Sequence, residues 1–220
     1  AADETDIADA IAAFESAAEL AVRAEFDCIE LHFGHGYLVS NFMSPKLNRR
    51  QDRWGGSVEN RARLAREVAK RVRGMVGDRA AVIAKLNMAD GVPRGLWLDE
   101  SVQIARLLES DGALDALELS GGSSFENPMY LFRGDAPVHE MAQAFPKGLR
   151  AGFRLTAGKF MKAYPWEEAY FLDYARQFRA ALRMPLILLG GINRLETVEQ
   201  AMADGFDFVS MGRALLRDPG

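Results

Sequence analysis

Five short apolar segments alternate along this chain with stretches of helical periodicity, and this alternation is the strongest constraint on its fold. Each segment is nearly continuous in apolar residues, as expected for strands whose two faces are both covered. A doubly wound sheet and a TIM (β/α)8 barrel both satisfy the pattern, and spacing alone separates them poorly. The predicted strands end near His32, Asn87, Leu119, Leu189 and Ser210.

Apolar residues at intervals of three and four predict the helices between these segments. Polar residues mark where the helices begin. Thr5 or Asp6 is expected to cap the first helix and Ser57 the second, while Asn193 and Glu196 form a capping-box-like start for a later one. Most of the arginines on the second helix are interpreted as a solvated face.

Two segments are too rich in polar, glycine and proline residues to be plain connections. The first covers residues 40–56. The second, about residues 120–166, is predicted to be an irregular loop or lid insertion. Long loops at strand ends often carry function, so both segments are candidates to border a site.

Two glycine-bearing strand ends near the C-terminus favour the barrel over the doubly wound sheet. They are Gly190-Gly191 and Gly212-Arg213, and the last two βα loops of a TIM barrel commonly form a phosphate cradle. The predicted fold is therefore α/β, an incomplete TIM barrel with about five of its eight strands. We expect residues 1–220 to form one partial barrel domain, strands four to eight of a longer protein whose first strands lie upstream.

Composition limits the kinds of binding partner and the cellular compartment that we expect for this protein. The 31 acidic and 27 basic residues give a net charge of −4 without long blocks of one sign, so neither nucleic acid nor an anionic membrane is expected as the main partner. No apolar run approaches the length of a membrane span, and no secretory signal opens the chain. The single cysteine, Cys28, falls in an apolar segment and is predicted to be a buried structural thiol of a cytoplasmic protein.

The segment His32-Phe33-Gly34-His35-Gly36-Tyr37 places three chemically active side chains directly at a strand end. Metal binding would need further ligands, and the remaining histidine, His139, lies far along the chain, so no metal site is predicted. Two neutral imidazoles could instead donate hydrogen bonds to a carbonyl oxygen and polarise it. A purely structural pair remains open, as does packing rather than proton donation for the Tyr37 phenol.

At the other strand ends, the sequence leaves more than one role open for the polar and glycine residues. Lys85 could be a surface residue, a Schiff-base lysine or a cation beside an electron-rich cofactor. Arg213 could clamp a phosphate or cap the sheet, with the neighbouring glycine favouring the phosphate. The Ser120-Gly121-Gly122 segment could be a simple turn, or bare backbone that lets a planar ring approach.

Taken together, the motifs closely resemble the old yellow enzyme family of FMN-dependent NADH:flavin oxidoreductases, over essentially the whole chain. The matching segments are His32–Leu38, Phe42–Pro45, Asn48–Arg50, Asp52–Arg61, Lys85–Asn87, Leu119–Gly122, Gly190–Ile192 and Met211–Pro219.

This resemblance implies a barrel that holds FMN at its C-terminal face, takes hydride from NADH or NADPH, and passes it to an activated alkene such as an α,β-unsaturated carbonyl or enoyl compound. By the same resemblance, His32 and His35 would bind the substrate carbonyl oxygen and Tyr37 would protonate the α carbon. The residues implied at the cofactor are Lys85 near the flavin ring, Ser120 and Gly121 beside it, and Gly190, Gly191, Gly212 and Arg213 at its phosphate.

The sequence departs from the family pattern at a few positions. Lys85 stands where many members have arginine, which keeps the charge but loses planar two-pronged hydrogen bonding. Phe33-Gly34 replaces two small residues, and Trp54 replaces a tyrosine. Two other functions remain open: a phosphate-binding barrel isomerase or lyase that uses Lys85 as nucleophile, and a barrel that binds flavin without catalysis. Substrate identity, nicotinamide preference and homo-oligomer formation are not encoded in visible motifs.

Overall fold

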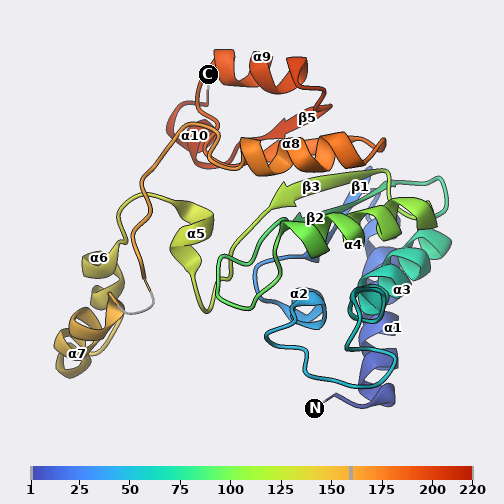
Figure 1. The fold of residues 1–220 in the computed structure, drawn as a ribbon, viewed down its shortest axis with the longest axis horizontal. Helices are drawn as coiled ribbons and strands as arrows, with labels where there is room; N and C mark the ends of the chain where they lie inside the picture. The colour runs from blue at the N-terminus through green and yellow to red at the C-terminus, as the bar shows by residue number, and fades with distance from the viewer. Residues whose placement is uncertain (1, 159–160, 220) are drawn as a thin grey trace.

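The computed structural model describes residues 2–158 and 161–219. Its strands form one parallel sheet whose spatial order is the order of the chain (Figure 1). A doubly wound sheet reverses its strand order at a switch point, whereas a barrel adds each strand beside the last. The predicted TIM-barrel class is therefore confirmed. The strands are β1 (Cys28–Phe33), β2 (Ala81–Asn87), β3 (Ala116–Ser120), β4 (Leu186–Leu189) and β5 (Phe208–Ser210).

The longer helices cover one face of this sheet and pack against each other in chain order, α1 on α3, α3 on α4 and α4 on α8. Figure 1 shows α1, α3 and α4 at one end of the sheet, and α8 with α9 at the other. This arrangement is the outer ring of a barrel. The helices are α1 (Glu4–Arg23), α3 (Val58–Val76), α4 (Leu98–Asp111), α8 (Leu172–Ala181) and α9 (Leu195–Ala203), with the short α2 (Leu38–Met43) and α10 (Arg213–Arg217).

The apolar segments predict a sheet that is apolar on both faces, but one face carries charged residues. Alternate residues such as Leu31 and Leu86 are buried beneath the helices, while the barrel-facing positions of β1 and β2 include Glu30 and Lys85. The prediction that Cys28 is buried is wrong, because the residue is exposed. β1 pairs only with β2 among the described strands, so Cys28 begins an edge strand with a neighbour on one side.

Helix capping matches the sequence prediction at one helix and differs at two others. Ser57 caps α3 as predicted, by accepting a hydrogen bond from the backbone N–H of Asn60. α1 begins earlier than predicted, because Asp3 makes the capping box. At α9 the cap comes from outside the helix: Oε1 of Glu168 accepts hydrogen bonds from the backbone N–H groups of Asn193 (2.7 Å) and Arg194 (3.1 Å).

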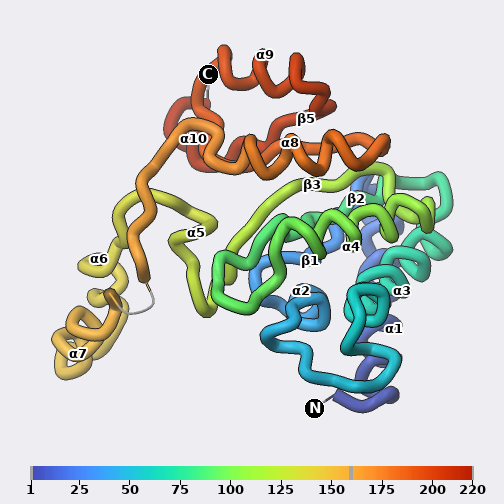
Figure 2. The backbone as a smooth tube through the Cα atoms, in the orientation of Figure 1, coloured from blue at the N-terminus to red at the C-terminus, as the bar shows by residue number. Residues whose placement is uncertain are grey.

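Both loop-like segments contain helices. α2 takes up the start of the first, and the second holds α5 (Pro128–Phe132), α6 (Val138–Gln143) and α7 (Lys147–Ala157). Figure 2 follows the backbone out of the body after β3, through α6 and α7, which stand away from the sheet, and back into α8. These helices are short and start at or just after a proline, so their periodicity is hidden among residues that normally mark turns.

Arg61 is an exception to the prediction that most arginines of α3 lie on a solvated face. Its side chain is 3% exposed and pairs with Glu100 of α4 at 2.5 Å. Its guanidinium also donates to the backbone carbonyl groups of Met43 (2.8 Å) and Gly56 (3.1 Å). Arg61 therefore fixes the long loop between α2 and α3 to the helical layer, which holds that loop beside the carboxyl ends of the strands.

Replacing Arg61 with alanine should destabilise the fold by about 2 kcal/mol, because the buried Met43 carbonyl, the Gly56 carbonyl and Glu100 lose their partner. The control is Arg71→Ala, which removes an exposed ion pair with Glu15 and should change stability by less than about 1 kcal/mol. Urea unfolding of the three proteins measures both effects. Equal losses in the two variants would contradict a special role for Arg61.

Candidate functional site

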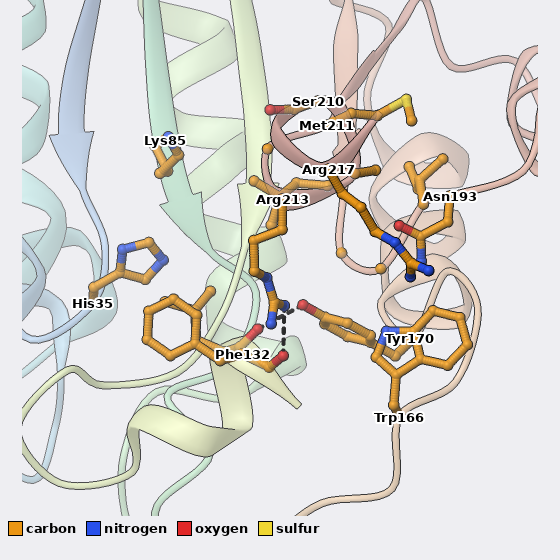
Figure 3. A pocket seen from close by; sticks show the side chains of 17 residues that line it. His35, Lys85, Phe132, Trp166, Tyr170, Asn193, Ser210, Met211, Arg213 and Arg217 are labelled. Carbon is orange, nitrogen blue, oxygen red and sulfur yellow. Dashed lines mark hydrogen bonds between the residues drawn. The ribbon is translucent and has the colours of Figure 1, made fainter. Parts of the chain in front are cut away.

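A cavity of about 450 Å³ opens at the carboxyl ends of the strands. Figure 3 shows His35 and Lys85 entering from the side of β1 and β2, and Asn193, Arg213 and Arg217 from the side of β4 and β5. Of the predicted site residues, the cavity is lined by His35, Lys85, Gly190, Gly191, Gly212 and Arg213. Lining residues that the sequence did not single out include Leu131, Phe132, Trp166, Tyr170, Asn193 and Arg217.

The cavity favours an anion. Arg213 and Arg217 bring positive charge to it, and the described residues that line it include no aspartate or glutamate. Lys85 also lines the cavity, but its ammonium is paired with Glu30 and Glu118. Arg213 donates a hydrogen bond to the backbone carbonyl of Phe132 at 2.7 Å, so its guanidinium lies across the cavity mouth (Figure 3). A phosphate or carboxylate is the kind of group that such side chains bind well.

The cavity glycines serve two different purposes. Gly190 and Gly191 have φ values of +123° and +70°, and a Cβ on them would lie 2.7 Å from the Phe171 ring and 2.6 Å from the Tyr170 ring. These glycines therefore allow the aromatic residues before α8 to pack against the loop. At Gly212, an added Cβ would meet open space among the described residues, so the backbone there is accessible to a ligand.

The predicted catalytic side chains lie together. The His32 ring is 4.9 Å from the His35 ring and 5.2 Å from the Tyr37 ring, centre to centre. Tyr37 in turn makes an edge contact with Phe125 at 5.6 Å and is 47% exposed. Of this group only His35 lines the cavity, so the cluster borders it on one side and faces outward on the other.

His35 is held in an unusual backbone conformation by three buried contacts. Its φ is +63°, which a residue with a side chain rarely adopts. Its N–H donates to Oδ1 of Asn87 at 3.1 Å, and its carbonyl accepts from the N–H of Ser124 at 2.9 Å. The ring nitrogen Nε2 lies 2.7 Å from Oγ of Ser120. Local backbone strain maintained by its surroundings is common at functional sites.

Ser120 and Gly121, which were also predicted at the cofactor, do not line the cavity. The Ser120 hydroxyl contacts the His35 ring, and a Cβ at Gly121 would lie 3.0 Å from the carbonyl oxygen of Ala89. Asn87 is a residue whose part in the site was missed, although its position at the end of an apolar strand was a usable signal. Its amide anchors His35 and also donates to Asp90 and to the carbonyl of Gly122.

Both histidines are neutral at neutral pH. Burial, together with repulsion from the Lys85 charge and from His32 when it is protonated, lowers the pKa of His35 from 6.5 to about 4. Burial and the Lys85 charge also lower the pKa of His32. A neutral imidazole offers one N–H donor, so the pair can donate hydrogen bonds to an oxygen without bringing net charge.

The Lys85 ammonium is paired within the barrel interior. Its Nζ lies 2.7 Å from Glu30 and 3.2 Å from Glu118, and in Figure 3 it points away from the His35 ring. Burial alone would lower the pKa of Lys85, but its bonds to these two carboxylates raise it above the ordinary value. A lysine held in the charged form is a poor nucleophile, which opposes a Schiff-base role.

Within residues 2–158 and 161–219, three or more His, Cys, Asp or Glu side chains do not gather in a way that could hold a metal ion. Over the same residues, every helix is too short or too polar to cross a membrane.

Fold and site together define part of a TIM barrel with an anion-favouring cavity at its strand ends. Residues 1–119 match the model of the NADH:flavin oxidoreductase / NADH oxidase family. The chain is 57% identical over 206 residues to a 4,4'-dithiodibutanoate disulfide reductase of Rhodococcus erythropolis, covering 94% of this chain and 51% of the relative. It is 33% identical over 215 residues to an NADH oxidase of Thermoanaerobacter brockii, covering 97% of this chain and 28% of the relative.

Solved structures agree with these sequence matches. A 2-naphthoyl-CoA reductase superposes with a TM-score of 0.74 at 27% identity, covering 97% of this chain and 28% of that one. The old yellow enzyme homologue from Zymomonas mobilis superposes with a TM-score of 0.68 at 23% identity, covering all of this chain and 51% of that one, which supports the fold.

The chain belongs to the NADH:flavin oxidoreductase family, the family of the old yellow enzymes. The resemblance inferred from the motifs is confirmed. The chain spans about half the length, or less, of the curated relatives it matches.

The low pKa of His35 predicts how stability changes with pH. Between pH 6.5 and 4 the unfolded chain binds a proton at this residue and the folded chain does not, so the free energy of unfolding should fall as pH decreases across that window. The loss attributable to His35 is up to about 3 kcal/mol. Urea unfolding from pH 7 to 4 should therefore show a shallower pH dependence in His35→Gln than in the unmodified protein; equal slopes would contradict a depressed pKa.

Proposed function

We propose that the protein containing this chain is an FMN-dependent oxidoreductase that takes hydride from NADH or NADPH and reduces an activated alkene, and that residues 1–220 form part of its FMN-binding barrel. The main support for this proposal is that an anion-favouring cavity and a pair of neutral histidines lie side by side at the same strand ends. Membership of a flavin oxidoreductase family supports the cofactor class and the nicotinamide donor.

The chemistry of the cavity fits FMN. A phosphate would be held by the backbone at Gly190, Gly191 and Gly212 and by the Arg213 guanidinium, which already reaches across the mouth. The aromatic rings of Trp166 and Tyr170 provide an apolar wall. When bound, FMN accepts a hydride from the nicotinamide and supplies reducing equivalents to the substrate.

His32, His35 and Tyr37 would act on the substrate. The two neutral imidazoles donate hydrogen bonds to the substrate carbonyl oxygen and so draw electron density from its β carbon. The Tyr37 phenol, 5.2 Å from the His32 ring between ring centres, supplies the proton that completes reduction at the α carbon. Ser120 and Asn87 keep the His35 ring and backbone in place for this task.

A second substrate class is favoured by a specific observation, the 57% identity to a disulfide reductase. A disulfide needs the same two electrons: one NAD(P)H and one proton convert it to two thiols. In this case the histidine and tyrosine donors would stabilise and protonate the departing thiolate rather than polarise a carbonyl. A flavin-binding barrel without catalysis would accept neither substrate.

A visible spectrum separates these possibilities. We expect the purified full-length protein that contains this chain to carry a flavin band that NADH or NADPH bleaches without oxygen, and that cyclohexenone or 4,4'-dithiodibutanoate restores. Recovery with the enone supports the alkene reductase; recovery with the disulfide alone reassigns the substrate. A band that the nicotinamide bleaches but neither acceptor restores supports binding without catalysis. A protein without flavin would refute the proposal.

The double variant His32→Ala/His35→Ala should lose at least about tenfold in kcat/KM for cyclohexenone, because two hydrogen bonds to the carbonyl oxygen are removed. Its FMN content should stay near that of the unmodified protein. His139→Ala on α6 is the matched control, since its side chain lies on an exposed helix outside the cavity. Loss of FMN from the double variant alone would assign the pair to cofactor binding or structure instead.

A further inference from the structure

Three charged side chains meet on the barrel-facing side of β1, β2 and β3. Lys85 is the register partner of both His32 and Glu118, and Glu30 lies two residues before His32 on the same face. The cluster of Glu30, Lys85 and Glu118 therefore sits in the barrel interior, directly beneath the candidate site. The active-site histidines and this cluster share one strand face.

The cluster is unbalanced in charge. One ammonium faces two carboxylates, and Nζ of Lys85 is closer to Glu30 (2.7 Å) than to Glu118 (3.2 Å). The Glu118 side chain is 8% exposed, and its buried Oε1 lies 3.2 Å from Nζ of Lys85 without a hydrogen-bond partner among the described residues. On the other side of Glu118, β4 and β5 add the uncharged residues Leu186–Leu189 and Phe208–Ser210.

The protonation of Glu118 follows from these surroundings. Burial, then its hydrogen bond with Glu30 and the Glu30 charge, raises the pKa of Glu118 to about 7, against the opposing effect of Lys85. Close to neutral pH, Glu118 is therefore present in both its ionised and its protonated form. With Glu118 ionised the three groups sum to one negative charge, and with Glu118 protonated they are neutral.

We propose that Glu118 is a positioning residue that, with Glu30, holds the Lys85 ammonium in the barrel interior and sets how much of its positive charge acts on an anion in the cavity above. This inference rests on the proposed FMN function. Reduced flavin carries more negative charge than oxidised flavin, so the cluster would set the ease of flavin reduction through electrostatics. Glu118 itself lies outside the lining of the cavity.

The midpoint potential of the bound flavin tests the proposal in the FMN-loaded protein. Glu118→Gln removes one negative charge with little change of shape, so it should shift the potential upward at pH 8. The shift should shrink at pH 6, where Glu118 of the unmodified protein is already protonated. Lys85→Met should shift the potential downward. Glu140→Gln, the same charge change on exposed α6, is the control and should leave it unchanged.

Equal potentials in Glu118→Gln and Glu140→Gln at pH 8 would overturn the inference while leaving the proposed function intact. A second measurement needs no cofactor. Carboxyl NMR of the protein should show Glu118 titrating near pH 7, at higher pH in Lys85→Met and at lower pH in Glu30→Gln. Titration of Glu118 at an ordinary carboxyl pKa, unaffected by both substitutions, would also refute the inference. Absence of FMN from the unmodified protein would refute only the proposed function.

Discussion

A single buried side chain, Asn87, joins the ends of three neighbouring strands. From the end of β2 it accepts a hydrogen bond from His35 after β1 and donates to the carbonyl of Gly122 after β3. Gly34 is required beside it, because a Cβ there would lie 2.8 Å from its Oδ1. Parallel strands bring their carboxyl ends to one edge, but this amide fixes the loops at that edge relative to each other, and so fixes the His35 backbone in its left-handed conformation.

Charge is layered along the barrel. The cavity at the strand ends is lined by arginine, lysine and neutral histidine, while the layer beneath it holds Glu30 and Glu118 around Lys85. The same lysine belongs to both layers. Its charge lowers the pKa of both histidines and offsets one of the two negative charges on Glu30 and Glu118, so a single substitution at Lys85 alters histidine protonation and cavity potential together. An enzyme that binds an anionic cofactor beside neutral donors needs this separation.

The sequence predicted those parts of the molecule that depend on local pattern. Apolar runs predicted the strands, and the residues at their ends predicted the histidine cluster and part of the cavity lining. It could not predict features decided by distant partners. Arg61 is buried because Glu100 and two backbone carbonyl groups from other segments meet it. Cys28 is exposed because it lies on the barrel-facing side of β1 with Glu30, whereas Leu31 on the other side is buried. Glu118 belongs to an apolar strand, and only the register with Lys85 reveals its partner.

The central claim is that the cavity and the histidine pair form one flavin-dependent site. A crystal structure of the protein with FMN tests it most directly. We expect the phosphate at Gly190, Gly191 and Gly212, with the Arg213 guanidinium turned from the Phe132 carbonyl onto the phosphate, and the flavin ring beneath His32 and His35. A phosphate bound elsewhere, or a ring that lies away from both histidines, would contradict it.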